Sequence, residues 1–222
     1  MRMCEISVEV GHDVLKANEE CALRNHHLLE YLGVTAFNVM GAIGSGKTTL
    51  IELAIDRIGE KYHIGVIAGD IVADIDADRF RRYDVPVISM NTGKECHLDA
   101  HLIEHALEQL PLDDLDILFI ENVGNLICPT DYSLGESKRV VIVSVSEGDD
   151  IVRKHPMIFK TCDLAIVNKV DIAGAVDVDA DKMVDDALRI NPHVKVMKTS
   201  KKTGEGIDDW IKFIEVSTDA HR

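Results

Sequence analysis

The chain has 222 residues, a formal net charge of −15, and 46% hydrophobic and 28% charged side chains. This length and composition are typical of one globular domain with a sizeable core. The acidic balance argues against binding to a nucleic-acid backbone, and no apolar run reaches the roughly 20 residues that span a bilayer. The N-terminus lacks the apolar region of a secretory signal. We therefore expect a cytoplasmic protein that binds neither nucleic acid nor membrane, with its five cysteines present as thiols.

Strand and helix patterns alternate along most of the sequence. Residues 12–32 carry apolar side chains at helical spacing, which predicts an N-terminal helix. Short apolar runs predict strands at residues 37–40, 63–68, 85–90, 116–120, 139–145, 163–167 and 194–197. Helical patterns cover residues 48–59, 97–110, 179–190 and 206–216. Nearly continuous apolar runs are typical of parallel strands covered on both faces, so we expect an α/β fold with a doubly wound, mostly parallel sheet flanked by helices.

A phosphate-binding loop follows the first expected strand. Residues 41–48 match the pattern G-x-x-x-x-G-K-[ST], and a helix pattern begins directly after them. The loop amides and the helix N-terminus then converge on an anion. Lys47 is expected to reach the β- and γ-phosphates, and the Thr48 hydroxyl to bind Mg²⁺. The residues expected to hold the phosphates are Gly41, Ala42, Ile43, Gly44, Ser45, Gly46, Lys47, Thr48 and Thr49.

A second motif indicates which base is bound. Residues 168–171 form N-K-x-D at the end of an expected strand. Asp171 can accept hydrogen bonds from guanine N1–H and N2–H₂, while Asn168 meets the Hoogsteen edge and the Lys169 stem lies along the ring. Ser200 and Lys201 loosely match the supporting base-contact loop. The sequence therefore predicts GTP as ligand, with a helical extension over residues 1–32 and a P-loop GTPase domain over residues 33–222.

Acidic side chains follow two of the expected strands. Glu121, followed by Gly124 three residues later, stands where GTPases have D-x-x-G. We expect Glu121 to bind Mg²⁺ through water and the Gly124 amide to approach the γ-phosphate; the alternative is a buried strand that ends in a turn. Asp70 and Asp76 are candidates to complete the Mg²⁺ shell or to position water. The expected catalytic residues are Lys47, Thr48, Asp70, Asp76 and Glu121, and the expected Mg²⁺ ligands are Thr48, Asp70 and Glu121.

The residue that would orient the attacking water differs from the usual one. Small GTPases carry a glutamine just after the switch glycine, and here that position is Asn125, which is shorter. We therefore expect slow intrinsic turnover.

Cysteines and histidines predict a transition-metal site. Cys96 and His97 stand at the start of the expected helix 97–110, and His101 and His105 follow at successive helical turns. A helix N-terminus favours the thiolate that a metal needs, and Cys128 follows the switch segment. Exposed histidines are more often solvated than ligating, so the argument depends on the two cysteines. Cys96, His97 and Cys128 supply three ligands for Zn²⁺ or Ni²⁺. A second copy of the chain, related by a two-fold axis, would supply more, and we expect GTP to tighten this homodimer.

Three stretches together, residues 41–48, 96–100 and 121–129, resemble the HypB family, the GTPases of hydrogenase nickel-centre maturation. The resemblance implies that Cys96, His97 and Cys128 hold Ni²⁺ or Zn²⁺ and that His101 joins them. It also implies a GTP-dependent homodimer and a HypA-like nickel-binding partner that serves the large subunit of [NiFe] hydrogenase. The chain has neither a histidine-rich stretch nor a C-x-x-C-G-C motif at its start, so metal handling is expected to fall on these side chains.

Two alternatives remain open. The urease-maturation GTPases of the UreG type share the architecture, but their metal motif is Cys-Pro-His, whereas Cys96 and His97 are adjacent here. The other is a regulatory, GTP-gated binding switch that holds zinc structurally. Metal dissociation rates that are equal in all nucleotide states would favour that switch.

Overall fold

The computed structural model describes residues 2–70, 75–93 and 97–221, with side chains described from residue 13 onward except at residue 75. Its centre is one seven-stranded sheet in the order β3-β2-β4-β1-β5-β6-β7, and every neighbouring pair is parallel. The strands are β1 (Thr35–Gly41), β2 (Ile64–Asp70), β3 (Val87–Asn91), β4 (Ile117–Glu121), β5 (Lys138–Ser144), β6 (Leu164–Asn168) and β7 (Lys195–Thr199). All seven predicted strands and the parallel, doubly wound sheet are confirmed.

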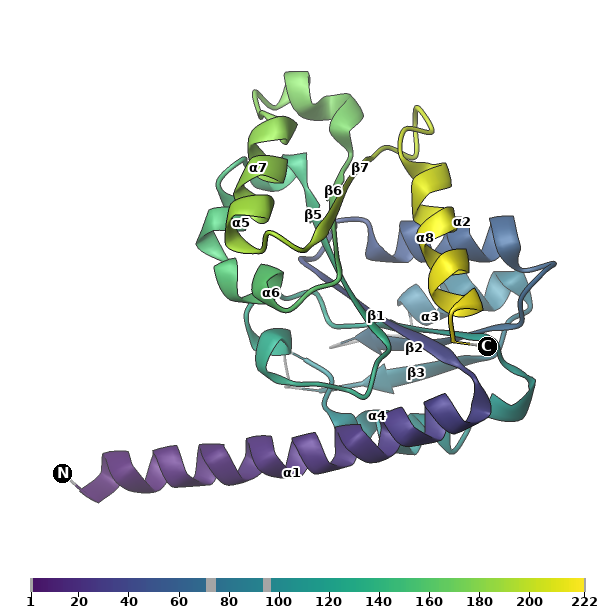
Figure 1. Cartoon of the computed structure of the whole chain (residues 1–222), viewed down its shortest axis with the longest axis vertical. Helices are drawn as coiled ribbons and strands as arrows, with labels where there is room; N and C mark the ends of the chain where they lie inside the picture. The colour runs from purple at the N-terminus through teal and green to yellow at the C-terminus, as the bar shows by residue number, and fades with distance from the viewer. Residues whose placement is uncertain (1, 71–74, 94–96, 222) are drawn as a thin grey trace.

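Helices cover both faces of this sheet (Figure 1). They are α1 (Arg2–Leu32), α2 (Lys47–Ile58), α3 (Ile75–Phe80), α4 (Ala100–Leu107), α5 (Ile151–Lys154), α6 (Pro156–Lys160), α7 (Ala180–Ile190) and α8 (Ile207–Asp219). Short 3₁₀ helices lie at η1 (Arg81–Tyr83), η2 (Leu112–Asp114), η3 (Cys128–Asp131), η4 (Val145–Glu147) and η5 (Val170–Ala175). The helices α3, α5 and α6 were not predicted, because four to six residues are too few to show a helical period.

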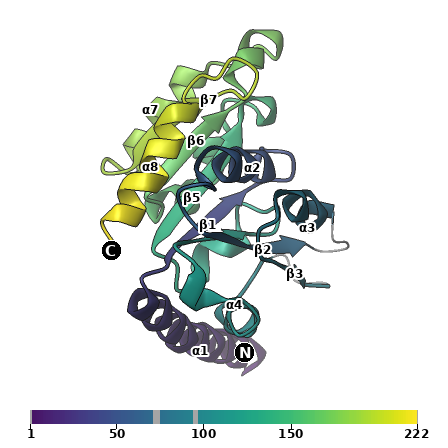
Figure 2. The ribbon, with the colours of Figure 1, turned by 90° about the vertical axis from the view of Figure 1, so that its right-hand side faces the viewer.

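The layers follow from the alternation of side chains along the strands. On β1, Phe37 and Val39 pack with α2 and α8, whereas Ala36 packs with α1 and α4 on the opposite face. Met40 lies in a third cluster, with α5, α6 and α7 over β5 and β6. Figure 2 shows α1 and α4 side by side under one half of the sheet. The core is therefore two-sided, as the continuous apolar strands predict.

The N-terminal helix is longer than predicted. It spans Arg2–Leu32, about ten residues more than the apolar pattern indicated, and its first part extends beyond the rest of the molecule (Figure 1). Its second half is anchored: Leu29 is buried in the core, and the Asn25 amide donates to the carbonyl oxygens of Ala100 (2.8 Å) and Leu134 (3.0 Å). None of the helices, within the part of the chain that the structure describes, combines the length and apolar character needed to cross a membrane.

Helix α4 begins later than predicted. It starts at Ala100 rather than at residue 97, because Asp99 is its N-cap and accepts a hydrogen bond from the Leu102 amide at 2.8 Å. His97 precedes this cap in a bend and is not part of the helix. The expectation that the helix begins at His97 was therefore wrong, and Cys96, the other residue expected at that start, lies outside the described residues.

Candidate functional site

The phosphate-binding loop follows the end of β1, which lies between β4 and β5 in the sheet. The chain connections run to opposite sides of β1 at this point. Such a switch point in a parallel sheet leaves a crevice at the carboxyl ends of the strands. Gly44 and Gly46 have φ angles of +78° and +108°, a region that L side chains rarely adopt. A Cβ on Gly46 would lie 2.2 Å from Asn168 Nδ2. Glycine is thus required there both by the backbone angle and by the close approach of the base-binding motif.

Lys47 is directed back onto this loop. Its Nζ donates to the carbonyl oxygens of Gly41 (3.2 Å) and Ala42 (3.3 Å), and the residue is 7% exposed. The ammonium group is therefore held at the loop by neutral acceptors. A phosphate oxygen is a stronger, charged acceptor for such a group.

A cavity of about 380 Å³ adjoins the loop. It brings together residues from the loop, the ends of β2 and β4, helix α3, and the segment after β6, which are far apart in the sequence. Its lining includes the predicted residues Ile43, Gly44, Gly46, Lys47, Thr48, Thr49, Asp70, Asp76, Glu121, Gly124 and Lys169. The motif reasoning therefore placed most of its candidates around one hollow.

Three oxygens meet inside this cavity. The Thr48 hydroxyl lies 2.8 Å from Glu121 Oε1, to which it donates, and 3.1 Å from Asp76 Oδ1. The second carboxylate oxygen of Glu121, Oε2, is buried and has no hydrogen-bond partner among the described residues. Burial raises the pKa of Glu121 to about 7, and the charge of Asp76 adds to that, whereas Lys47, Thr48 and Arg79 oppose it. An uncompensated carboxylate beside a hydroxyl and a second carboxylate is a donor set that suits Mg²⁺.

The two aspartates differ in position. Asp76 contacts Thr48 directly, whereas Asp70 ends β2 and lines the same cavity. The roles of both in Mg²⁺ binding and water positioning stay predictions.

Arg79 is a cavity residue that the sequence reasoning missed. Its guanidinium forms an ion pair with Glu52, donates to Thr49 Oγ1 at 3.3 Å, and lies 3.8 Å from Asp76. The contact with Glu52 raises the pKa of Arg79 above its already high value. The sequence showed only a basic cluster at residues 79–82, and α3 was not predicted. The helix directs the first arginine of that cluster to the phosphate side.

The N-K-x-D motif is fastened to the phosphate loop. Asn168 Nδ2 donates to Ser45 O at 2.8 Å, and Lys169 Nζ donates to Gly44 O at 2.6 Å. Asp171 accepts a hydrogen bond of 2.6 Å from the Ser200 hydroxyl. Residues more than 120 positions apart are thereby joined in one arrangement, as the motif spacing predicts. Lys201 follows Ser200 in an exposed turn.

The switch segment lies against the phosphate loop. Gly41 and Asn125 form an isolated antiparallel bridge. A Cβ on Gly124 would lie 2.3 Å from Ile43 Cγ1 and 3.0 Å from the Ile43 nitrogen. The same segment continues to Cys128, a half-buried cysteine that is not in a disulfide and stands at the first position of η3.

The predicted nickel or zinc ligands are only partly described. Cys96 lies outside the described residues. His97 is half-buried, with its ring 4.0 Å from that of Tyr132 between centroids. His101 lies on α4, where its ligand atom is within 4.8 Å of those of Cys21 and Glu104. Cys21 was assigned no metal-binding role in the sequence reasoning, because it lies 80 residues before His101 on another helix.

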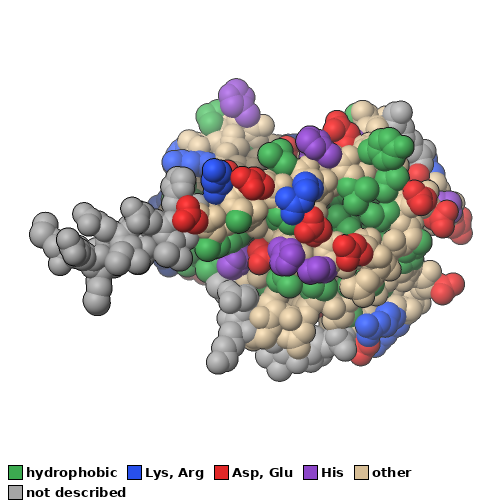
Figure 3. Space-filling view, turned by 90° about the horizontal axis from the view of Figure 1, so that it is seen from below, with side chains coloured by type: hydrophobic (Ala, Val, Ile, Leu, Met, Phe, Trp, Pro, Cys, Tyr) green, Lys and Arg blue, Asp and Glu red, His purple; other side chains and the backbone are tan. Residues whose placement is uncertain are grey.

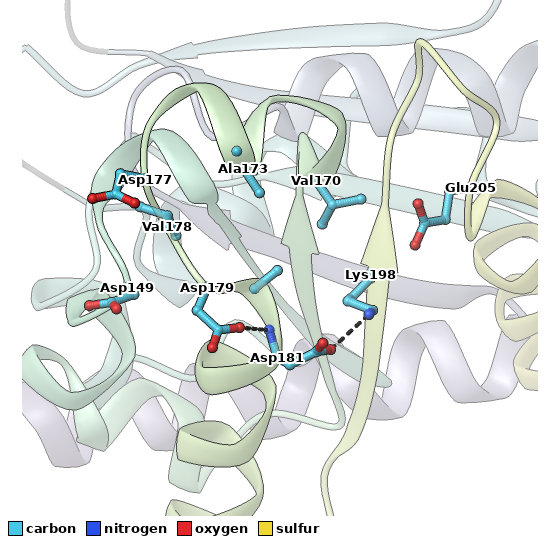
Figure 4. A pocket seen from close by; sticks show the side chains of 11 residues that line it. Asp149, Val170, Ala173, Asp177, Val178, Asp179, Asp181, Lys198 and Glu205 are labelled. Atoms are coloured by element: carbon cyan, nitrogen blue, oxygen red, sulfur yellow. Dashed lines mark hydrogen bonds and ion pairs between the residues drawn. The ribbon is translucent and has the colours of Figure 1, made fainter.

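A larger hollow of about 600 Å³ lies away from the phosphate loop, between η5, α7 and β7 (Figure 4). Five carboxylates line it: Asp149, Asp177, Asp179, Asp181 and Glu205. Three of them have structural partners: Asp179 caps α7, Asp181 pairs with Lys198 at 2.7 Å, and Asp149 pairs with Lys182 at 2.7 Å. Carboxylates dominate this lining and repel phosphate, whereas the smaller cavity places Lys47 and Arg79 beside its carboxylates. The smaller cavity is therefore the candidate nucleotide site.

Comparison with known proteins agrees with this geometry. The family model described as CobW/HypB/UreG, nucleotide-binding domain, matches residues 35–198. The chain is 55% identical to the probable hydrogenase maturation factor HypB of Methanocaldococcus jannaschii, over 95% of each protein. The chain belongs to the HypB family. It is also 41% identical to HypB of Escherichia coli K12, covering 94% of this chain and 72% of that protein.

Solved structures extend the HypB assignment to three dimensions. HypB from Archaeoglobus fulgidus superposes with a TM-score of 0.87 at 50% identity, covering 91% of this chain and 99% of that one. HypB from Helicobacter pylori, solved in complex with nickel, gives a TM-score of 0.87 at 33% identity, covering 92% and 96%. A LAO/AO transport system kinase, at 20% identity and a TM-score of 0.60, shares the fold. The P-loop NTPase fold and the nucleotide-binding family are thereby confirmed, and the relatives named above carry the HypB name rather than that of UreG.

Proposed function

We propose that this protein is a GTP-hydrolysing metallochaperone that assists nickel insertion into [NiFe] hydrogenase. The observation that carries the proposal is the joining of the N-K-x-D motif to the phosphate loop beside the acid-lined cavity. Membership of the HypB family supplies the biological setting. A HypA-like nickel-binding protein and, indirectly, the hydrogenase large subunit are the proposed partners, in the cytoplasm.

The cavity residues divide the work of hydrolysis. Lys47 and the loop amides bind the β- and γ-phosphates, and Asp171 selects guanine. Thr48, with Glu121 and Asp70 or Asp76, would hold Mg²⁺, which neutralises charge that develops on the phosphates. Asp76 reaches the Thr48 hydroxyl and is the better placed of the two aspartates to orient a water molecule.

Slow turnover follows from the switch segment. Asn125 stands where an efficient GTPase has glutamine, and its Oδ1 accepts a hydrogen bond from the Ile127 amide at 2.9 Å. The oxygen keeps a second lone pair, but this contact turns the short side chain toward its own segment, so we expect it to orient an attacking water poorly.

Single-turnover hydrolysis tests the enzymatic part. We expect phosphate release from GTP at less than about 1 s⁻¹, the lower end for efficient phosphoryl-transfer enzymes, and no release from ATP. Lys47→Ala should abolish it. Equal rates with GTP and ATP would contradict the guanine assignment, and a GTP rate above that limit would contradict the argument from Asn125.

For the metal, we propose that Cys96, His97 and Cys128 bind Ni²⁺ or Zn²⁺ at a homodimer interface that responds to GTP. Support comes from the switch segment, which carries Cys128 and contacts the phosphate loop at Gly41 and Ile43. Residues 1–32 would act as an extension of the GTPase domain formed by residues 33–222.

Nickel dissociation from the wild-type chain, followed with a GTP analogue, with GDP and without nucleotide, tests this coupling. We expect rates that differ between nucleotide states, loss of tight binding in Cys128→Ala, and no change in Cys162→Ala, whose thiol is buried elsewhere. Light scattering should show a dimer that the GTP analogue favours. Equal rates in all three states would favour the switch with structural zinc.

A further inference from the structure

Three cationic side chains, among the residues that the structure describes, line the nucleotide cavity: Lys47, Lys169 and Arg79. The two lysines belong to the nucleotide motifs, and each donates to a carbonyl oxygen of the phosphate loop. Arg79 belongs to neither motif and reaches the cavity from α3. The roles assigned above to the motif residues leave the charge of Arg79 without a function.

The rest of the protein gives a nucleoside triphosphate little electrostatic help. The net charge is −15, and acidic side chains are spread over the face that Figure 3 shows. Asp70, Asp76 and Glu121 add carboxylates inside the cavity itself. A cation that is fixed in such a partly closed site interacts with phosphate more strongly than it would in open water. The position of Arg79 therefore matters for a ligand that carries several negative charges.

The guanidinium of Arg79 is held beside the phosphate loop by a forked contact. Nε donates to Glu52 Oε1 at 3.0 Å, and Nη2 donates to Glu52 Oε2. Nη2 also donates to Thr49 Oγ1 at 3.3 Å, on the residue after the loop. The Glu52 side chain is 12% exposed and lies on α2, the helix that begins in the loop. Two parallel hydrogen bonds to one carboxylate fix the plane of the guanidinium.

The third nitrogen of this guanidinium, Nη1, makes no hydrogen bond with the described residues. It lies 3.8 Å from Asp76 Oδ1, which is too far for a hydrogen bond. The same Asp76 oxygen lies 3.1 Å from the Thr48 hydroxyl. Because the Arg79 side chain is 33% exposed and lines the cavity, Nη1 can donate to a phosphate oxygen while Glu52 keeps the other side of the fork.

We propose that Arg79 is a catalytic residue, which donates to the phosphates of bound GTP and stabilises the charge that develops during hydrolysis. The inference rests on the proposed function. In the reaction, the oxygen of water bonds to the γ-phosphorus, and the bond from that phosphorus to the bridging oxygen breaks. The electron pair stays on the β-phosphate of GDP, and the water protons pass to inorganic phosphate and solvent. A planar, permanently charged donor beside the β- and γ-phosphates stabilises this shift of charge.

Glu52 is a positioning residue, because it orients Arg79 and acts on the reaction through it. The slow turnover expected from Asn125 is compatible with this role. Asn125 concerns the orientation of the attacking water, whereas Arg79 concerns charge on the phosphates. A protein with the second device and without the first should hydrolyse GTP slowly, and more slowly still without Arg79.

Single-turnover hydrolysis and the affinity for a non-hydrolysable GTP analogue, measured on the same variants, test the proposal. Arginines that act in this way accelerate GTP hydrolysis about 10³–10⁵-fold. For Arg79→Ala we expect hydrolysis to fall about 100-fold or more, and the affinity for the analogue to fall far less. Arg82→Ala removes an exposed arginine of the same cluster and should change neither quantity. Millimolar guanidinium ion should restore part of the hydrolysis in Arg79→Ala and none in Lys47→Ala.

Two further measurements separate charge stabilisation from a structural role. Arg79→Ala should bind GDP with aluminium fluoride, which mimics the transferring phosphoryl group, more weakly than wild type, and should bind GDP alone as wild type does. Unchanged GDP binding also shows that the variant is folded. The double variant Glu52→Gln/Arg79→Ala should hydrolyse GTP no more slowly than Arg79→Ala alone, because Glu52 acts through Arg79.

The outcomes distinguish this inference from the proposed function. Wild-type hydrolysis in Arg79→Ala, or a loss of hydrolysis matched by an equal loss of affinity for the GTP analogue, would overturn the inference. Arg79 would then be an ion pair that joins α3 to α2, and the proposed function would stand. A wild-type protein that does not hydrolyse GTP would overturn both.

Discussion

The protonation of Glu121 in the metal-free protein yields a sharp prediction. The residue is 2% exposed, and burial raises its pKa from 4.5 to about 7. Between those values the native state binds a proton that the unfolded state releases. The contribution of Glu121 to the free energy of unfolding is therefore largest below pH 4.5 and falls as pH rises toward 7. A change of about 2.5 pKa units, at 1.36 kcal/mol each, corresponds to about 3 kcal/mol.

Glu121→Gln isolates this effect, because glutamine keeps the shape of the protonated acid and cannot ionise. We expect the unfolding free energy of the variant, relative to wild type, to increase by about 2–3 kcal/mol between pH 5 and pH 8. Urea denaturation with a chelator and without nucleotide measures it. All other titrating groups are common to both proteins and cancel in the difference. Glu60→Gln, at an exposed position, is the control and should follow wild type.

Adding magnesium and a GTP analogue should reverse the effect of ionisation on the stability of wild type relative to Glu121→Gln. The ionised carboxylate then has a divalent cation nearby, so wild type should gain more stability at pH 8 than Glu121→Gln gains. Parallel stability curves for the two metal-free proteins from pH 5 to 8 would refute the reasoning. They would mean that Glu121 is already ionised in the empty cavity and that burial does not govern its charge.

Three further substitutions probe other contacts. Gly124→Ala forces a Cβ to within 3.0 Å of the Ile43 nitrogen, so hydrolysis should fall at least tenfold while urea unfolding changes by less than about 1 kcal/mol; unchanged hydrolysis would contradict the contact. Asp171→Asn removes a charged acceptor for guanine, so displacement of a fluorescent analogue should show GTP affinity falling roughly 10- to 150-fold, from about 1.5–3 kcal/mol. Trp210→Phe removes the 3.0 Å hydrogen bond from Nε1 to the buried Leu50 carbonyl and should lower the unfolding free energy by about 1–3 kcal/mol without altering GTP affinity.

The sheet was predictable because each strand is a short, almost continuous apolar run between turns. Burial on both faces removes the polar alternation that makes half-exposed strands ambiguous. The start of α4 was less predictable, because the apolar pattern already begins at Leu98, two residues before the first residue of the helix. Only the hydrogen bond from the Leu102 amide to Asp99 places the cap.

The site divides along similar lines. The motifs at residues 41–48 and 168–171 were recognisable because each is a short continuous segment. Its required residue types therefore stand at fixed spacings in the sequence. Arg79 was missed because its importance comes from packing. It enters the cavity through a helix of six residues, which is too short to show a helical period in the sequence.

The contacts of Asn122 suggest a route by which one nucleotide influences both segments that we propose to bind metal. This residue is 1% exposed and directly follows Glu121, the acid in contact with Thr48. Its Oδ1 accepts from the Leu98 amide at 3.2 Å, and its Nδ2 donates to Asn38 Oδ1 at 3.2 Å. The segment that leads to Cys128 is thus bonded at its beginning to the backbone next to His97. A movement of Glu121 toward a cation would pull on both segments through one buried amide, so the segment that carries His97 needs no direct contact with the nucleotide.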